Sequence, residues 1–382
     1  MGVVIKQSLW SSVISYLGVF LGAFAYLWLY PKFLSPGQIG ILQFIQAAAI
    51  TLATILQFTA PSTFIKFLPG IPEERRNNFF YFIHAYLIPM LIIGLFLLLI
   101  FKEPLLALYT TNASSIIPYF LHILILIFPI VFFNIYEALL KVHANIIIPN
   151  LLRDIQIRLF TILLVVAHVL KLISFNMLIN GLVLNYTIAF IIILFLTNKK
   201  IQPGPFRIKI PDFSYIKKML NYSLFALLSN ISAIVISRID ILMIGSMLGM
   251  NAVGIFSVTF FMASIIDIPR KAIVQISSPI ISNYWHQNEM NGLADIYQKA
   301  SKNLFIIGSL IFLGIWLNRD LIFHIIPNAA TYQKGMYVIF YVGLARLIDM
   351  SFGPNAEIIV FSNYYKVNLV LSATLSVLLV FT

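Results

Sequence analysis

Long apolar runs dominate this sequence and decide what the chain can fold into. A membrane-spanning helix needs about 20 mostly apolar residues, and ten runs come close to that length. They lie at 9–30, 39–59, 79–101, 116–140, 151–170, 175–196, 219–244, 253–279, 303–318 and 336–361. An eleventh run begins near Val367 and is cut off at Thr382, so we expect at least one further span.

The composition agrees with the apolar runs. Hydrophobic residues make up 60% of the chain and charged residues 10%, compared with roughly 25% charged in soluble domains. A soluble domain of this size cannot bury so much apolar surface, which excludes a soluble enzyme, a coiled coil and a disordered chain. Transmembrane barrels alternate polar and apolar residues and are also disfavoured. We therefore predict an all-α polytopic membrane protein.

Few motifs point to cofactor or metal chemistry. The chain contains no cysteine, which excludes disulfides, thiolate metal sites and cysteine nucleophiles. It also has no Walker-type phosphate loop and no HExxH or paired-histidine metal spacing. We expect no metal and no cofactor. The net charge of +12 is spread thinly between apolar runs, so we attribute it to membrane topology and expect no nucleic-acid partner.

The loops predict the orientation in the membrane. With a cytoplasmic N-terminus, sixteen of the 25 Lys and Arg residues lie on the cytoplasmic side and five on the other side. Cytoplasmic loops are normally enriched in these residues. The first apolar run lacks a small-residue cleavage site, so we interpret it as a retained span.

Residues 198–218 form the longest strongly basic connection, and their prolines at 203, 205 and 211 oppose helix. We interpret them as a cytoplasmic linker between a six-span bundle at 1–197 and an incomplete bundle of about five spans at 219–382. An ordinary loop is the alternative. Attraction to lipid headgroups would be a secondary role for the basic residues.

The two halves show an internal repeat. SLWSSVISYLG from Ser8 matches SLFALLSNISA from Ser223, and LSPGQIGIL from Leu34 matches LGMNAVGIF from Leu248 at an offset of 214. TAPSTFIKF from Thr59 resembles SSPIISNYW from Ser277. Both halves begin after a cytoplasmic flank, so the repeat predicts two bundles related by a pseudo-two-fold axis along the membrane normal. Chance similarity of apolar helices is the alternative.

The stretch SRIDILMIGSMLGMNAVGIFSVTFFMASIIDIPRKAIVQISSPIIS at 237–282, with its first-half counterpart FLSPGQIGILQF from Phe33, carries a family resemblance. It resembles the polysaccharide (O-antigen, Wzx-type) flippases of the multidrug/oligosaccharidyl-lipid/polysaccharide exporter superfamily. The elements in common are an R-x-D step, a glycine-bearing turn, V-G-I-F-S, and a polar span that ends in P-x-I-S.

The resemblance implies a function. Such a protein would move a polyprenyl-diphosphate-linked oligosaccharide from the inner to the outer leaflet by alternating access, for O-antigen, lipopolysaccharide or related polysaccharide biosynthesis. The setting would be the bacterial cytoplasmic membrane. The resemblance also implies coupling to a cation gradient, of H⁺ or Na⁺, and leaves open whether a polysaccharide polymerase is a partner.

Charged residues within spans are costly unless they face a cavity or a partner, so each is a candidate for function. Cationic side chains suit a diphosphate, and the substrate-binding candidates are Arg238, Arg270, Lys271, Arg346 and Arg153. The alternatives are headgroup snorkelling for Arg238 and self-neutralised pairs at helical spacing. These pairs are Asp267 with Arg270 or Lys271, Arg346 with Asp349, Glu137 with Lys141, and Asp154 with Arg158.

Acidic residues and helix breakers complete the candidates. The cation-coupling candidates are Asp240, Asp267, Glu137 and Asp349. Pro269 frees a backbone carbonyl within its span, and Gly353 with Pro354 should bend a later one, so these three are the predicted hinge residues.

Three other functions remain open. A multidrug or organic-cation antiporter of the same fold would want an acidic binding lobe, yet the first three spans contain no Asp or Glu. A membrane-embedded glycosyltransferase or polymerase would need acidic groups in sizeable outer loops, where only Glu103 and Asp320 are found. A lipid II flippase is harder to distinguish from an oligosaccharide flippase by sequence.

Overall fold

The computed structural model describes residues 2–109, 113–143, 145–198 and 213–362, followed by 367, 370, 371, 373–375 and 378. Every regular element in this part of the chain is helical, which confirms the predicted all-α class. The α-helices are α1 (Gly2–Ala23), α2 (Tyr30–Phe33), α3 (Pro36–Leu56), α4 (Ala60–Phe67), α5 (Glu73–Ile100), α6 (Lys102–Ala107), α7 (Ala113–Ile116), α8 (Phe120–Val142), α9 (Ile147–Asn150), α10 (Ile157–Val169), α11 (Phe175–Asn198), α12 (Phe213–Met247), α13 (Met250–Ser264), α14 (Ile268–His286), α15 (Met290–Leu317), α16 (Arg319–Ile325), α17 (Ala329–Tyr332), α18 (Met336–Ser351) and α19 (Asn355–Phe361).

Eight helices in the described residues are long and apolar enough to cross a membrane. They are Trp10–Phe33, Pro36–Leu56, Glu73–Ile100, Ile117–Val142, Phe175–Asn198, Lys217–Met247, Met250–Ser278 and Met290–Leu317. The predicted span at 151–170 is also helical, but it carries three charged residues near its start. The predicted span at 336–361 is divided between α18 and α19.

Two sequence predictions lie wholly or partly outside the described residues. Most of the basic linker at 198–218 falls in the undescribed segment 199–212. Only single positions of the last apolar run are described. The division of the chain at this linker therefore stays a prediction.

The chain forms two compact units. The first unit consists of Met1–Leu21, Ile41–Gly249 and Leu375–Thr382, and the second of Gly22–Gly40 and Met250–Thr374. Each unit therefore contains residues from both halves of the predicted repeat. Helix α12, from the second half of the sequence, lies in the first unit, and α2 lies in the second.

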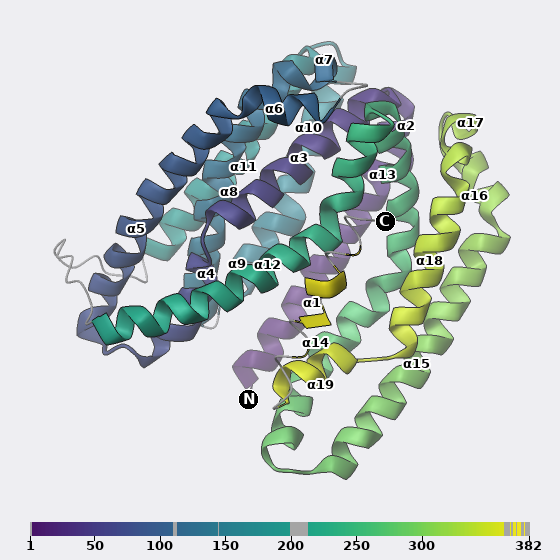
Figure 1. The fold of residues 1–382 in the computed structure, drawn as a ribbon. Coiled ribbons are helices and arrows are strands. Elements are labelled where there is room, and N and C mark those ends of the chain that lie inside the picture. Colours follow the sequence, from purple (N-terminus) through teal and green to yellow (C-terminus); the bar gives the residue numbers. More distant parts are fainter. Residues whose placement is uncertain are drawn as a thin grey trace. The chain divides into compact units, whose positions relative to one another are not determined.

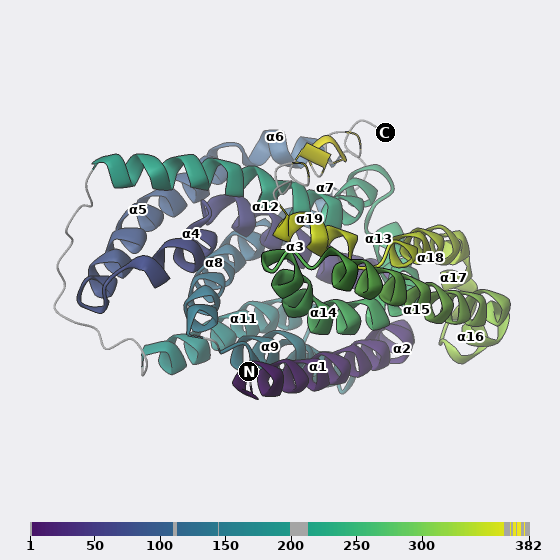
Figure 2. The same cartoon turned by 90° about the horizontal axis from the view of Figure 1, so that it is seen from below.

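Helix α8 is at the centre of the first unit. It packs against α4 and α11, as Figures 1 and 2 both show. Its side chains are apolar on nearly every face, which is typical of a helix surrounded by protein. Leu126, Ile127, Val131 and Ile135 are fully buried. This helix provides the rigid wall on which the candidate site is built.

The second unit is built on α13, α14, α15 and α18, with α15 and α18 side by side (Figures 1 and 2). Its apolar core contains Ile266, Leu304, Phe312 and Met350. Glycines let the helices approach closely, since Gly308 lies against Met350 and Gly343 against Phe312. Small residues at such contacts are typical of membrane helices.

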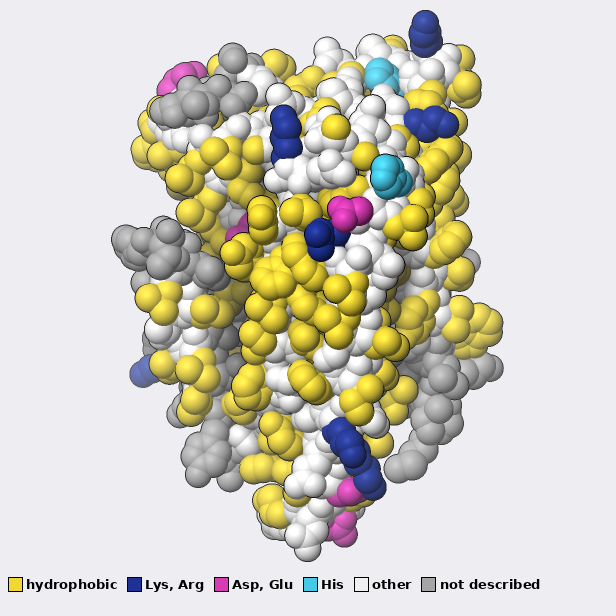
Figure 3. Space-filling view, turned by 90° about the vertical axis from the view of Figure 1, so that its right-hand side faces the viewer, with side chains coloured by type: hydrophobic (Ala, Val, Ile, Leu, Met, Phe, Trp, Pro, Cys, Tyr) yellow, Lys and Arg dark blue, Asp and Glu magenta, His cyan; other side chains and the backbone are white. Residues whose placement is uncertain are grey.

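The outer surface of the helices is apolar. Large hydrophobic side chains are widely exposed, such as Phe20 at 72% and Leu310 at 73%. On the face drawn in Figure 3, hydrophobic side chains form a broad band, and most charged side chains lie above or below it. Such a band matches a lipid-facing surface.

Of the breaks between consecutive helices in the described residues, three bear on the candidate site and on the predicted hinges. Between α3 and α4, Phe58 and Thr59 adopt positive φ angles of 42° and 59°. A 3₁₀ turn, Ile265–Asp267, separates α13 from α14. Between α18 and α19, Gly353 has φ +58°, so the bend predicted at Gly353–Pro354 is present in the structure.

The bend at Gly353 predicts a glycine-specific stability effect. A Cβ at Gly353 would lie 2.3 Å from Ser301 Oγ in addition to the unfavourable φ, so Gly353→Ala should lower the stability by about 1–2 kcal/mol. Gly314, in the last turn of α15, has nothing within 4 Å of an added Cβ, so Gly314→Ala should be neutral or stabilising. Thermal unfolding in detergent compares the two. Equal Tm shifts would show that the bend does not require glycine at position 353.

Candidate functional site

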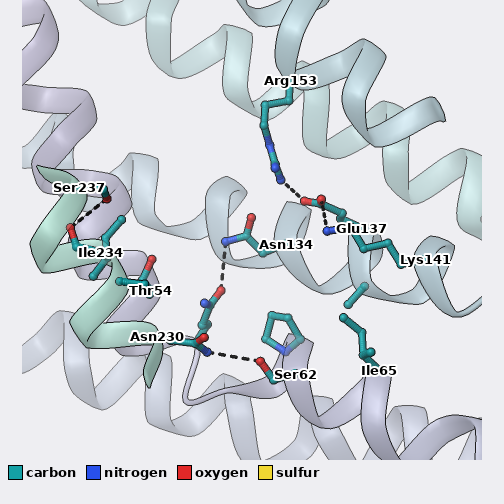
Figure 4. Close-up of a pocket in the computed structure, with 14 residues that line it drawn as sticks. Thr54, Ser62, Ile65, Asn134, Glu137, Lys141, Arg153, Asn230, Ile234 and Ser237 are labelled. Carbon is teal, nitrogen blue, oxygen red and sulfur yellow. Dashed lines mark hydrogen bonds and ion pairs between the residues drawn. The ribbon is translucent and has the colours of Figure 1, made fainter. Parts of the chain in front are cut away.

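A cavity of about 350 Å³ lies within the first unit (Figure 4). This volume is within the range of small-molecule sites. Its walls come from the α3–α4 break, α8, the segment that contains Arg153, and α12. The lining residues are Thr54, Gln57, Pro61, Ser62, Ile65, Asn134, Glu137, Ala138, Lys141, Arg153, Asn230, Ala233, Ile234 and Ser237.

The break between α3 and α4 shapes one wall of the cavity. Positive φ is rare for a β-branched residue such as Thr59, and Thr59 is only 1% exposed. The turn places Gln57 before the break and Ser62 after it in the same lining. Strained backbone of this kind is often found at functional sites.

A charged cluster lies at one end of the cavity. The carboxylate of Glu137 is buried, with 5% of the side chain exposed. Lys141, one helical turn later on α8, places its Nζ 2.7 Å from Glu137 Oε1. Arg153 donates from Nη2 to Glu137 Oε2. Two cations share one carboxylate, so this end of the cavity has an excess of positive charge.

A π-helical turn brings Arg153 to the cluster. The turn, Leu151–Gln156, directly precedes α10, and π turns frequently occur at functional sites. The guanidinium of Arg153 also lies 5.7 Å from the centre of the Phe133 ring. About half of its side chain is exposed, so the head group is available to a ligand.

Neutral hydrogen-bonding groups line the rest of the cavity. Asn134 Nδ2 donates to Gln57 Oε1 over 3.0 Å, and Asn230 Nδ2 donates to Ser62 Oγ over 3.3 Å. Figure 4 shows Asn134 near Glu137, and Asn230 with Ser62 farther from the charged cluster. Amide side chains supply both donors and acceptors, which suits a ligand with many hydroxyl groups.

Helix α12 forms the wall opposite α8 and is held to α4. Thr63 Oγ1 and Ser223 Oγ lie 3.3 Å apart, and Lys66 Nζ lies 3.8 Å from the centre of the Tyr222 ring. Because α12 belongs to the second half of the sequence, the cavity takes side chains from both halves.

One expected pair is not formed by the described side chains. Asp154 Oδ2 accepts a hydrogen bond from Ser15 Oγ over 3.0 Å, and Arg158 donates to the backbone oxygen of Gly18. Asp154 therefore ties α1 to the π turn before α10, and Arg158 ties α1 to the start of α10, in place of bonding to each other. Gly18 lies directly against Asp154, and this close approach brings the polar groups together.

The second unit holds a second group of candidate charges. Arg270 Nε lies 3.2 Å from Asp349 Oδ2, which joins α14 to α18. Lys271 Nζ lies 3.8 Å from Asp267 Oδ2. Asp267 was expected to pair with Arg270 or Lys271, and it pairs with Lys271. Asp349 was expected to pair with Arg346, but it pairs with Arg270. Sequence spacing could not identify a partner on another helix.

The remaining candidates are placed as follows. Arg238 is half-buried on α12, directly after the cavity-lining Ser237, and Asp240 is exposed. Arg346 is half-buried on α18. All proposed roles of these residues in binding or coupling stay predictions.

The predicted hinge residues mark helix ends. Pro269 lies in the first turn of α14, directly after the 3₁₀ turn, where proline is well tolerated. Gly353 and Pro354 lie between α18 and α19. Movement at these positions stays a prediction.

The neutral residues of the cavity, namely Gln57, Ser62, Asn134 and Asn230, were not among the predicted site residues. The predicted residues were charged, because a charge in a span has the larger cost. A usable signal was present in the sequence, since Asn134 is the single amide side chain in the mostly apolar sequence of α8. Isolated amides in membrane helices also seek hydrogen-bond partners.

The charged cluster predicts an unequal response to the loss of two carboxylates. Glu137→Ala leaves Lys141 and Arg153 without their partner and should cost about 2–3 kcal/mol. Glu73→Ala is the control, because Glu73 is 88% exposed and lies 3.4 Å from Arg76, so its loss should cost less than about 1 kcal/mol. Thermal unfolding in detergent measures both. Comparable Tm shifts would show that the ion pairs of Glu137 with Lys141 and Arg153 do not stabilise the fold.

Known proteins share the fold of this chain. The lipid II flippase MurJ in an inward closed conformation superposes with a TM-score of 0.63 at 14% identity, covering 96% of this chain and 84% of MurJ. An inward-facing multidrug resistance MATE transporter of the MOP superfamily gives a TM-score of 0.63 at 14% identity, with coverage of 98% and 88%. A MOP superfamily transporter from Pyrococcus furiosus, noted for the reverse polarity of its binding pocket, gives 0.56 at 15% identity, with coverage of 99% and 93%. At these identities the likeness shows the fold alone.

A family model confirms the sequence resemblance. The model for the family described as polysaccharide biosynthesis protein matches residues 5–285. No curated protein matches the chain. The shared fold confirms the predicted architecture of two bundles related by a pseudo-two-fold axis. The chain therefore belongs to the family described as polysaccharide biosynthesis protein, and it has the fold of the MOP superfamily structures.

Proposed function

We propose that this protein is a flippase that moves a polyprenyl-diphosphate-linked oligosaccharide from the inner to the outer leaflet of the bacterial cytoplasmic membrane. Transport would proceed by alternating access, with the N-terminus in the cytoplasm. Family membership supports a role in polysaccharide biosynthesis. The observation that carries the proposal is the cavity in the first unit, which combines a positive excess with neutral hydrogen-bonding groups.

The charged end of this cavity suits a diphosphate. Glu137 offsets one positive charge, and the second remains for a ligand. The guanidinium of Arg153 is permanently charged and can donate two parallel hydrogen bonds to phosphate oxygens. The half-exposed Lys141 adds a point charge beside it. In a site of low dielectric constant, such an excess attracts an anion strongly.

The neutral wall of the cavity suits the sugar. Gln57, Asn134, Asn230 and Ser62 are already arranged in donor–acceptor pairs. Each pair can exchange its internal bond for bonds to sugar hydroxyls without burying an unsatisfied group. The polyprenyl chain needs no protein pocket, because the bilayer solvates it.

The second unit supplies further cations for the same substrate. Arg270, Lys271 and Arg346 outnumber Asp267 and Asp349. Arg270 remains 18% exposed beside Asp349. We propose that these cations hold the anionic group at another stage of transport.

The coupling ion is proposed from the buried carboxylates. Glu137 and Asp267 are 4% and 7% exposed, and each lies beside a cation. Protonation or Na⁺ binding at such a carboxylate would release its cation toward the substrate. A partner polymerase stays a prediction from the family resemblance.

The proposal predicts loss of transport in charge variants. In the native host, depletion of the protein should make oligosaccharide-loaded polyprenyl diphosphate accumulate, as measured by lipid extraction and mass spectrometry. Restoring Arg153→Ala or Arg270→Ala should leave most of this accumulation, because the anionic group loses a ligand. Lys299→Ala, which removes an exposed i,i+4 pair with Asp295, is the control and should restore transport.

Two results would count against the flippase. The first is that the oligosaccharide-loaded carrier stays at its normal level when the protein is depleted. The second is that Arg153→Ala and Arg270→Ala restore transport as well as Lys299→Ala does. Altered efflux of cationic dyes, together with a normal carrier level, would favour the multidrug antiporter.

A further inference from the structure

The π turn Leu151–Gln156 carries Arg153 on one side and is held on two other sides by polar side chains. On the side of α1, four hydrogen bonds join residues that lie 139 or 140 positions apart in the sequence. The bonded pairs are Gln7 with Ile146, Ser11 with Asn150, Ser15 with Asp154, and Gly18 with Arg158. We call these four pairs the polar ladder.

The polar ladder is in register with α1 only because of the π turn. The offset between partners is 139 at Ser11 and at Ser15, and 140 at Gly18. The facing segment therefore contains one residue more than α1 over the same length. A π turn closes its hydrogen bonds over five residues where an α-helix uses four, so it takes up this additional residue and keeps both ends of the ladder paired.

Helix α11 holds another side of the π turn through Asn185, which is fully buried. Asn185 Oδ1 accepts a hydrogen bond from Gln156 Nε2 over 2.7 Å. Asn185 Nδ2 donates to the backbone oxygen of Ile157 over 2.8 Å and to Thr161 Oγ1 over 3.2 Å. Ile157 is the first residue of α10. An amide that accepts on one side of this junction and donates on the other fixes where the π turn ends.

The polar ladder also keeps a carboxylate away from the cavity. Asp154 directly follows Arg153, and consecutive residues of a helix do not face the same way. Ser15 Oγ donates to Asp154 Oδ2 over 3.0 Å on the side of α1. Arg153 points to Glu137 on α8, as Figure 4 shows. The carboxylate of Asp154 is thus held on the α1 side, and the excess of positive charge at the end of the cavity is preserved.

We propose that Ser15 and Asn185 are positioning residues for Arg153, because their hydrogen bonds set the π turn from which the guanidinium reaches the cavity. The inference rests on the proposed function, in which Arg153 binds the diphosphate. Neither Ser15 nor Asn185 is among the residues that line the cavity. Both therefore act through the π turn and not by contact with the ligand.

The first test measures the position of residue 153 without any cargo. The chain has no cysteine, so Glu137→Cys with Arg153→Cys introduces one pair of thiols and removes one charge of each sign. A short bifunctional thiol reagent should bridge this pair in isolated membranes. Adding Ser15→Ala or Asn185→Ala should lower the cross-linked fraction several-fold, because the π turn loses a hydrogen bond that holds it. An unchanged fraction with both variants would overturn the proposal.

Two further variants separate the lost hydrogen bond from general damage. Ser15→Thr keeps a hydroxyl at this position and should restore the parent cross-linked fraction. Thr187 lies on α11, two residues from Asn185, and its hydroxyl donates to the Val183 oxygen of the same helix over 2.9 Å. Thr187→Val should therefore leave the fraction unchanged. A decrease as large as that with Asn185→Ala would show that any polar loss on α11 has this effect, and would overturn the role of Asn185.

The second test asks whether the two residues act through Arg153. Inorganic pyrophosphate is the probe, and calorimetry on the purified protein measures its Kd. Ser15→Ala and Asn185→Ala should each raise this Kd several-fold in the parent. In an Arg153→Ala background they should leave the Kd unchanged, because no guanidinium remains to be misplaced. The same fold-change in both backgrounds would show a purely structural role and would overturn the proposal.

These tests distinguish the positioning role from the proposed function. The cross-linked fraction reports the position of residue 153 whatever the cargo is. If depletion of the protein leaves the oligosaccharide-loaded carrier at its normal level, the proposed function fails, while cross-linking still decides how residue 153 is held. If the loaded carrier accumulates and the cross-linked fraction is unchanged by Ser15→Ala and Asn185→Ala, only the positioning role fails.

Discussion

Hydrocarbon cannot solvate an ionised side chain, and this constraint governs how the candidate site is built. Each charge within a span needs an opposite charge, a cavity or water. Glu137 meets this need with Lys141 and Arg153, and the same contacts tie α8 to the segment that begins α10. In the second unit, the pair of Arg270 and Asp349 joins α14 to α18 in the same way. Structure and candidate function therefore depend on the same charges.

The second constraint is that the hydrophobic effect does not drive helices together in lipid. The helices associate instead through van der Waals packing, which is closest at small residues. Gly18 brings α1 against Asp154, and Gly40 and Gly254 bring backbone against backbone. These glycines stand where segments distant in sequence meet.

Much of the fold could be predicted from the sequence, because the apolar runs and the bilayer thickness together fix the helices. The repeat also paired the segments from Leu34 and Leu248, in which the equivalent helices α3 and α13 begin at Pro36 and Met250. The bend predicted at Gly353 with Pro354 is present as well. The break at Phe58 and Thr59 could not be predicted, since neither residue normally favours positive φ. Partners such as Asp349 for Arg270 depend on neighbouring helices. Gln57 and Asn230 join the site only through tertiary packing.

The most direct test of the account is transport by the purified protein. Full-length protein would be reconstituted into vesicles that carry polyprenyl-diphosphate-linked oligosaccharide extracted from the native host on both leaflets. Sugar that can be reached by an impermeant oxidant would be measured over time. The account predicts that the protein exposes the protected pool of sugar, and that Arg153→Ala does so far more slowly. A protected pool that persists with correctly folded protein, under both H⁺ and Na⁺ gradients, would contradict it.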